Sequence, residues 1–258
     1  MVSGIDIFRE HFSNFKKQYT IIGGFACYLL MGEAELDFRQ TADIDMVLIV
    51  EAITTEFGKA IWSFIDAGGY LQQQSSKNPT FYRFSKPTNP AYPKMIELFS
   101  RPQNNVVLQP DTHLMPLHID DEVSSLSAIM LDDDYYRFLL DGQTVADDIS
   151  VLDVEHIIPL KMKAWLDLNS KKEEGLEVNS KDVKKHCLDV FRLFQLVRGN
   201  QKVYVPKSVG ADISNFIEQM RNKEIPLKDI GVSRSKDSIL DIYNQMYILE
   251  KEKENSDE

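Results

Sequence analysis

The chain has 258 residues, and 43% of them are hydrophobic, which is enough to bury the core of one large or two modest domains. Its formal net charge is -11 at pH 7, which argues against a protein that coats nucleic acid without specificity. A local basic groove around one site is compatible with this charge.

The cysteines and the N-terminus indicate the compartment. Cys27 and Cys187 are far apart in the sequence and form no CxxC motif, which favours a reducing cytoplasm and gives no zinc or disulfide signal. The N-terminal residues MVSGIDIFREHF contain charges among the apolar residues, unlike a signal peptide. No apolar run approaches the roughly 20 residues that cross a bilayer. We therefore expect a cytoplasmic protein with no membrane partner.

The first 150 residues alternate between two hydrophobic periods. Apolar residues at helical spacing predict helices, and short apolar blocks between Gly, Pro and Asn clusters predict strands. In chain order the predicted elements are helix 4–17, strand 19–22, helix 25–36, strand 43–50, helix 52–67 and strands 70–74, 80–85, 94–100, 106–109 and 125–131. The acid-rich residues 131–136 are expected to form a solvated turn.

From about residue 152 onwards the hydrophobic period is helical. Helices are predicted over 156–168, 182–197, 208–220 and 237–249. The final residues, KEKENSDE, are charged and have nothing to bury, so 251–258 is expected to be a disordered tail. The predicted organisation is an α/β domain over 1–150 followed by an all-helical domain over 151–250.

Two aspartates stand at the start of the predicted strand 43–50. Because side chains at i and i+2 point to the same face of a strand, Asp43 and Asp45 project side by side. Like charges this close repel, so we expect a cation between them, and a divalent ion with oxygen ligands is the simplest candidate. Glu97 interrupts an otherwise apolar strand and is the best candidate for a third carboxylate, which would complete the oxygen ligands and accept a proton from an attacking hydroxyl.

A glycine pair separates the strand 19–22 from the helix that follows. Gly23 and Gly24 allow the backbone to approach a ligand closely, and the helix N-terminus presents free N–H groups and the positive end of the helix dipole. Phosphates bind readily at such a place. Together with the two aspartates, this turn predicts a site for phosphates and the metal ion that bridges them.

The combined pattern GG-x(14)-R-x-T-x-D-x-D (residues 23–45), followed by MIELFS (95–100), resembles the nucleotidyltransferase superfamily. Arg39 and Thr41, just before the D-x-D pair, are similar to the R-x-T of the AbiEii/AbiGii-type family of bacterial toxins. The resemblance covers roughly residues 15–200.

Two segments of the second half are similar to the helical part of the same family: K-x-x-A at 161–164 and D-x-x-R-L at 189–193. By matching position, Lys161 would neutralise phosphate charge as a compact cation, and Asp189 would lie near the nucleotide.

The resemblance implies a nucleotidyltransferase-like α+β fold, with a small mixed β-sheet flanked by helices and an all-helical C-terminal domain that closes the cleft. It implies transfer of a nucleoside monophosphate from an NTP to a hydroxyl, with two Mg²⁺ ions and release of pyrophosphate. The catalytic and metal-binding residues would be Asp43, Asp45 and Glu97. The nucleotide-binding residues would be Gly23, Gly24, Arg39, Thr41, Lys161 and Asp189.

The identity of the acceptor stays open at this stage. The family suggests an RNA or a protein, and a role as the toxin of a toxin–antitoxin or phage-defence pair with an antitoxin partner. One alternative is an enzyme that modifies a small molecule such as an antibiotic. Another is a non-catalytic member that binds a nucleotide or a partner protein, because Gly24 stands where many superfamily enzymes have a serine that contacts phosphate, and Glu97 replaces the commoner aspartate.

Several cations also have two interpretations. Arg39 either contacts the substrate or pairs with the aspartates and holds them in place. Lys163 competes with Lys161 for the phosphate role, although it points to a different face of the helix. The cluster of Lys181, Lys184 and Lys185 is either a solvated helix face or a contact for the nucleotide or an RNA backbone.

Overall fold

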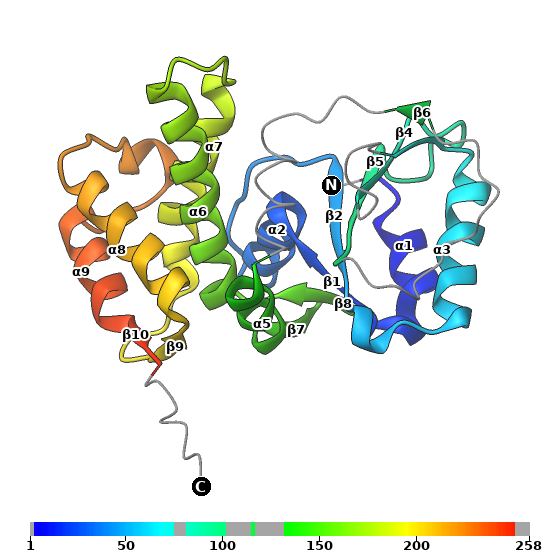
Figure 1. The fold of residues 1–258 in the computed structure, drawn as a ribbon, viewed down its shortest axis with the longest axis horizontal. Coiled ribbons are helices and arrows are strands. Elements are labelled where there is room, and N and C mark those ends of the chain that lie inside the picture. Colours follow the sequence, from blue (N-terminus) through cyan, green and yellow to red (C-terminus); the bar gives the residue numbers. More distant parts are fainter. Residues whose placement is uncertain (1–2, 75–80, 102–114, 117–131, 251–258) are drawn as a thin grey trace, which may run out of the picture.

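A computed structural model describes residues 3–74, 81–101, 115–116 and 132–250, which adopt an α+β fold around a mixed sheet (Figure 1). Within these ranges, every helix is too short or too polar to cross a bilayer. The strands predicted at 106–109 and 125–131 and the predicted tail at 251–258 lie outside the described residues.

The large sheet has the strand order β6-β3-β4-β5-β2-β1-β8-β7. Its strands are β1 (Tyr19–Ile22), β2 (Asp43–Leu48), β3 (Leu71–Gln74), β4 (Phe81–Ser85), β5 (Met95–Phe99), β6 (Met115–Pro116), β7 (Gln143–Ala146) and β8 (Ile149–Leu152). The sheet is mixed because β2 runs parallel to β5 but antiparallel to β1, while β1 runs parallel to β8. The central strand β2 therefore has a neighbour on each side, and its apolar residues from Met46 to Leu48 are buried.

Helices cover the sheet on two sides. In Figure 1, α1 and α3 lie together on the side away from the C-terminal helices, and α2 lies between the sheet and α6. The helices of this half are α1 (Ile5–Phe12), α2 (Gly23–Glu33), α3 (Thr55–Gly68) and α5 (Asp133–Asp141), with 3₁₀ turns at η1 (Ser13–Phe15) and η2 (Val50–Ala52). The predicted end of α3 is confirmed, because Gly69 adopts the left-handed conformation that terminates a helix.

Aromatic packing joins α1 and α3 to the first residue of β1, Tyr19. The ring centroids of Phe8 and Phe12 lie 5.8 and 5.2 Å from that of Phe64, and Tyr19 stacks on Phe57. These rings are buried, so the helical spacing of the phenylalanines in the first helix is explained by one core-facing stripe.

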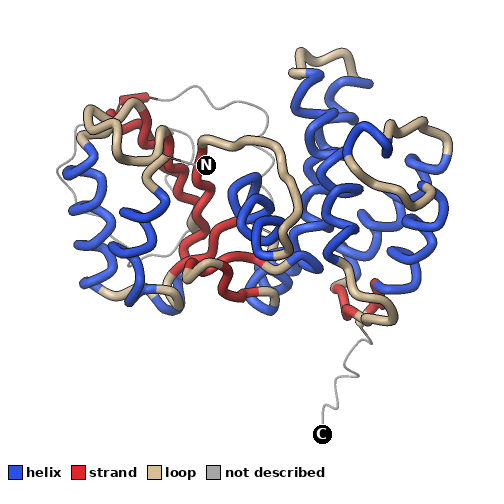
Figure 2. The backbone as a smooth tube through the Cα atoms, turned by 180° about the vertical axis from the view of Figure 1, so that it is seen from behind, coloured by secondary structure: helices blue, strands red, loops and turns tan. Residues whose placement is uncertain are grey.

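The C-terminal helices gather on one side of the sheet, which is clearest from behind (Figure 2). They are α6 (Val154–Glu173), α7 (Ser180–Leu193), α8 (Lys207–Arg221) and α9 (Lys236–Met246), with 3₁₀ turns at η3 (Phe194–Leu196) and η4 (Leu227–Ile230). The prediction that this half is all-helical is wrong in one detail, since β9 (Val203–Val205) and β10 (Tyr247–Leu249) pair in parallel. Three-residue strands are too short to produce a recognisable alternation in the sequence.

The structure near residue 150 differs from the predicted elements in two ways. The hairpin β7–β8 was not predicted, because its two-residue turn uses Asp147 and Asp148 at positive φ instead of a glycine. The predicted boundary between 150 and 151 therefore falls inside β8. The segment expected to be a solvated turn begins α5, because Asp132 accepts hydrogen bonds from the backbone N–H groups of Asp134 and Tyr135 and so caps the helix.

Candidate functional site

The two aspartates of β2 face a pocket of about 310 Å³ at the centre of the sheet. Asp43 and Asp45 are half-buried and point to the same face, while Ile44 between them is fully buried on the other. The pocket brings together most of the predicted site residues: Gly24, Arg39, Thr41, Asp43, Asp45 and Glu97.

Glu97 lies beside Asp45 because the parallel strands β5 and β2 place the two residues in register. The carboxyl groups of Glu97 and Asp45 are hydrogen-bonded to each other. Burial and the negative charge of Asp45 raise the pKa of Glu97 to about 9, although Arg83 opposes this shift. The predicted convergence of Glu97 on the aspartates is thus present, and Glu97 keeps its proton to a higher pH than an exposed glutamate does.

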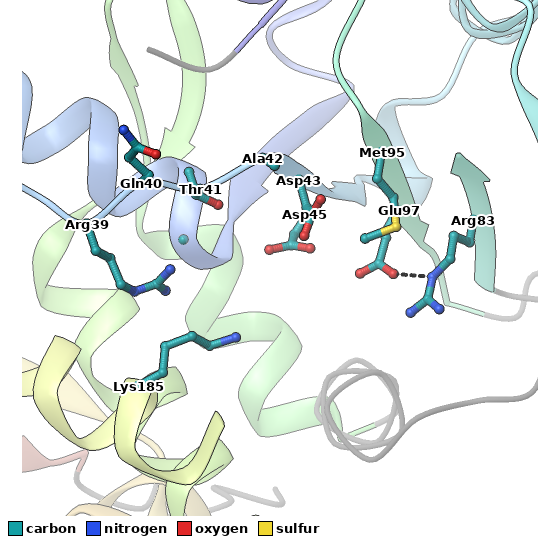
Figure 3. Close-up of a pocket in the computed structure, with 11 residues that line it drawn as sticks. Arg39, Gln40, Thr41, Ala42, Asp43, Asp45, Arg83, Met95, Glu97 and Lys185 are labelled. Atoms are coloured by element: carbon teal, nitrogen blue, oxygen red, sulfur yellow. Dashed lines mark hydrogen bonds and ion pairs between the residues drawn. The ribbon is translucent and has the colours of Figure 1, made fainter. Parts of the chain in front are cut away.

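Arg83 is a pocket residue that the sequence interpretation missed. It lies on β4, in register with Glu97, and its Nε donates to Glu97 Oε1 at 2.5 Å. Figure 3 shows Glu97 flanked by Arg83 on one side and the two aspartates on the other. A basic residue in the middle of the apolar strand 80–85 was the signal that could have identified it.

The glycine turn leaves room for the acidic cluster. Gly23 has a φ of 70°, and a Cβ at this position would overlap Asp45 Oδ2 and lie 2.9 Å from its Cγ. A Cβ on Gly24 would lie 3.0 Å from Thr41 Oγ1 and 3.2 Å from an Arg39 nitrogen. Both glycines therefore allow a helix N-terminus to reach the carboxylates and the loop that precedes β2.

Arg39 is held by a buried carboxylate of the helical half. Its Nη2 donates to Asp189 Oδ2 at 2.8 Å, and its Nε lies 3.1 and 3.2 Å from the two Asp189 oxygens. Arg192 Nη1 lies 3.1 Å from Asp189 Oδ1, and Lys161 Nζ lies 3.6 Å from Oδ2. Burial alone would raise the pKa of Asp189, but the charges of Lys161, Arg39 and His186 and the Arg39 hydrogen bonds lower it.

Lys161 and Asp189 therefore lie behind Arg39, and neither lines the pocket. Lys161 is 4% exposed and Asp189 is fully buried, so neither side chain reaches the pocket directly. Asp189 affects the pocket by holding Arg39 in place. Lys163, the competing residue, binds Asp167 and Asp212 on the helical side. The lysine that does line the pocket is Lys185 on α7, which belongs to the predicted basic cluster.

The pocket is polarised along its length. Arg39 and Lys185 lie on one side of the aspartates in Figure 3, and Glu97 with Arg83 lies on the other. A pocket with this arrangement can bind a cation at its carboxylates. It can also bind an anionic group between those carboxylates and the side chains of Arg39 and Lys185.

The donor set is suited to a magnesium ion in its chemistry. Asp43 and Asp45 offer carboxylate oxygens, which hard cations prefer, and the absence of a Cβ at Gly23 keeps the space beside Asp45 clear. In the described ranges, however, three His, Cys, Asp or Glu side chains do not come together as a preformed metal site. Metal binding by Asp43, Asp45 and Glu97 stays a prediction.

The comparisons with known proteins are sparse. No protein-family model matches the sequence, and no curated protein matches it. Among solved structures, the chain is similar to the crystal structure of JHP933 from Helicobacter pylori, with 11% sequence identity and a TM-score of 0.33. That similarity covers 94% of this chain and 88% of JHP933, but it is too low to support an argument about fold or function.

Proposed function

We propose that the protein is a metal-dependent nucleotidyltransferase of nucleotidyltransferase-like fold, which transfers a nucleoside monophosphate from an NTP to a hydroxyl group. The observation that carries the proposal is the placement of Asp43, Asp45 and Glu97 on adjacent strands beside the Gly23–Gly24 turn. The resemblance of the same residues to the superfamily pattern supports it.

In this proposal each wall of the pocket has one task. Asp43 and Asp45 hold a magnesium ion, which supplies Lewis-acid stabilisation of phosphate charge when bound. The backbone N–H groups at the start of α2 bind the phosphates, and Arg39 and Lys185 balance their charge from the other side. These residues orient the α-phosphate toward the acceptor.

The chemical step is an in-line displacement at the α-phosphorus. The acceptor hydroxyl oxygen forms a bond to this phosphorus, the bond to the bridging oxygen breaks, and pyrophosphate leaves with the electron pair. The hydroxyl proton passes to the ionised form of Glu97, which requires that Arg83 and a cation bound at the aspartates offset the burial and the Asp45 charge that raise its pKa.

RNA is the acceptor that the surface favours. Lys181 and Lys184 are exposed on α7, and Lys185 of the same helix reaches the pocket. In a chain of net charge -11, this local cluster is suited to contact a phosphate backbone next to the site. By the family resemblance, the protein would act as a toxin with an antitoxin partner, and Mg²⁺ and an NTP would be its cofactor and donor.

Incubation with magnesium, each α-labelled NTP and total RNA or cell extract tests the proposal. We expect label on RNA, and we expect Asp45→Asn to abolish it. Replacement of the three lysines by glutamine should weaken RNA labelling and reduce its salt dependence. Label on protein or on a small acceptor would retain the enzyme and change its substrate, whereas NTP binding without label on any acceptor would reject transfer.

One observation favours a second candidate, a non-catalytic nucleotide- or partner-binding protein. Arg83 Nε already donates to Glu97 Oε1, so the carboxyl group on which proton transfer depends is engaged by a cation of the chain itself. The same labelling experiment separates the two candidates, because a binding protein retains NTP affinity and produces no pyrophosphate.

A further inference from the structure

A second cavity lies at the C-terminal end of α2. It has a volume of about 540 Å³ and is lined by residues of the segment 28–38 and by Asp147 from the turn between β7 and β8; we call it the α2 groove. Cavities of this size are typical of binding sites. Phe38 lines the groove, and the guanidinium carbon of Arg39, which lines the pocket with the aspartates, lies 5.2 Å from the centre of the Phe38 ring. The α2 groove and the candidate site are therefore neighbours.

The apolar part of the groove comes from a helix that has no polar side. Residues 25–31 of α2 are all apolar or aromatic, so apolar atoms face outwards wherever neither the sheet nor α6 covers the helix. Tyr28 on α2 and Leu36 and Phe38 in the loop that follows are only half-buried, and all three line the groove. A segment that covered the groove would bury this apolar surface.

The acidic part of the groove lacks compensating cations. Glu33 ends α2, where the helix dipole is negative, and the last turn of the helix contains no basic residue. Glu35 and Asp37 are exposed, and within the described ranges no cation pairs with either of them. The sequence over 18–38 contains no lysine or arginine, so the segment that forms the groove supplies no positive charge of its own.

Asp147 is the one carboxylate of the groove that a cation of the chain binds. Its partner is Arg9, and its backbone N–H donates to Glu33 Oε1 at 2.7 Å. These contacts hold the β7–β8 turn against the end of α2. Neither contact involves Glu35 or Asp37, so the negative charge at the rim of the groove comes mainly from these two residues.

We propose that the α2 groove docks a basic segment of a partner protein, which places an apolar side chain against Leu36 and Phe38 and lysine or arginine side chains beside Glu35 and Asp37. Complementarity of charge selects this occupant, because opposite charges across an interface steer association and like charges oppose it. A nucleic-acid backbone, or a second copy of this chain with its net charge of -11, would be repelled by the same carboxylates. The inference does not depend on nucleotide transfer, so its failure leaves the proposed function intact.

Fluorescence anisotropy of a labelled peptide of alternating lysine and leucine, titrated with the full-length chain at physiological salt, tests the inference. We expect saturable binding, which the double variant Glu35→Gln, Asp37→Asn should weaken about tenfold. A peptide with serine in place of leucine should also bind about tenfold more weakly, because it buries no apolar side chain. The leucine peptide should protect backbone amides of the segment 28–38 from hydrogen exchange.

A matched double variant controls for the acidity of the whole chain. Glu224→Gln, Asp229→Asn removes the same two types of charge from exposed positions of the helical half and should leave peptide binding unchanged. All four carboxylates are exposed, so both double variants should fold as the wild type does, which circular dichroism checks.

Several results would overturn the inference, each in a different way. The absence of saturable binding, or protection from exchange only outside the segment 28–38, would remove the groove as the docking surface. Equal losses in the two double variants, or equal affinities of the leucine and serine peptides, would reduce the binding to attraction by net charge. Spermine that bound as tightly as the leucine peptide would assign the groove to a small polycation. A dimer in sedimentation of the wild type that Glu35→Gln, Asp37→Asn dissociated would assign the groove to a second copy.

Discussion

The two charged clusters on either side of the pocket are opposite in composition. At the sheet, the carboxylates of Asp43, Asp45 and Glu97 gather beside Arg83. At the helical side, the single carboxylate of Asp189 is bound by Arg39, Lys161 and Arg192. Both clusters are partly or fully buried, so water screens the excess negative charge of the first and the excess positive charge of the second only weakly.

The two clusters differ in how their carboxylates are surrounded. In the acidic cluster, burial and the negative charge of Asp45 raise the pKa of Glu97, so like charges are held close together there. In the Asp189 cluster, one carboxylate accepts hydrogen bonds from Arg39 and Arg192 and pairs with Lys161, and it thereby fixes Arg39 at the pocket. Removal of a carboxylate should therefore have opposite effects on stability in the two places.

The largest expected effect is from Asp189→Ala. This change leaves three cations without their shared buried acceptor and should lower the free energy of unfolding by about 3–5 kcal/mol. Urea denaturation measures the loss. Asp182→Ala is the matched control, because it removes a partly exposed carboxylate of the same helix and should have a much smaller effect. Equal losses in both variants would contradict the structural role of Asp189.

The Asp189 contribution should also depend on pH. Because folding lowers the pKa of Asp189, its ionised form stabilises the folded state above the unfolded-state pKa of about 3.9. This stabilisation is lost as the pH falls through the lower pKa of the folded protein. The difference in stability between the wild type and Asp189→Asn should thus be constant near neutral pH and should narrow in acid.

Gly23→Ala should have the second largest effect. The new Cβ would overlap the Asp45 carboxylate and would hold a non-glycine residue at positive φ, so we expect a loss of about 1–3 kcal/mol. Gly32→Ala is a control in the same helix with no atom within 4 Å of the added Cβ, and it should stabilise the protein by about 0.5–1 kcal/mol. Thermal denaturation of both variants measures the contrast, which a neutral Gly23→Ala would refute.

Removal of the two aspartates of β2 should not lower the free energy of unfolding, in contrast to removal of Asp189. Because Asp43 and Asp45 are like charges on one face of β2, the double variant Asp43→Asn, Asp45→Asn should retain or gain stability, by up to about 1 kcal/mol without metal. Nucleotide transfer should disappear in the same variant. A substantial loss of stability would place these aspartates among the structural residues, beside Asp189.

The smallest expected effect is from Lys185→Gln. This partly exposed cation lines the pocket, so its neutralisation should weaken NTP binding about 2–5-fold with little change in stability. Calorimetric titration at low and high salt measures the change, which should shrink as salt rises. Lys181→Gln, on the exposed face of the same helix, should leave NTP binding unchanged, and equal effects from both lysines would remove Lys185 from the site.

Most of the large elements could be predicted from the sequence because burial imposes a regular period. The phenylalanine stripe of α1, the glycine end of α3 and the apolar run of β2 each follow from one local pattern. The hairpin β7–β8 and the pair β9–β10 lacked such a pattern, because one turn has no glycine and the other strands have three residues each.

The site could be predicted best where spacing along one strand or turn determines it, and Glu97 was identified because it interrupts an apolar strand. Asp43, Asp45, Gly23 and Gly24 are close in the chain, so their proximity follows from local geometry. The partners of Arg39 and Glu97 could not be predicted, because strand register and helix docking select them. The register of β4 with β5 places Arg83 opposite Glu97. The packing of α7 against α6 places Lys161 beside Asp189, behind Arg39 and outside the pocket.

The bond between Arg39 and Asp189 also has a consequence for how the protein is made. The two residues are 150 positions apart, so the loop before β2 acquires its anchor long after β2 itself has been synthesised. At roughly 5–20 residues per second, a ribosome needs about 8–30 s to cover that distance. A nascent chain therefore carries the acidic pair for about this time before Asp189 is present to fix Arg39.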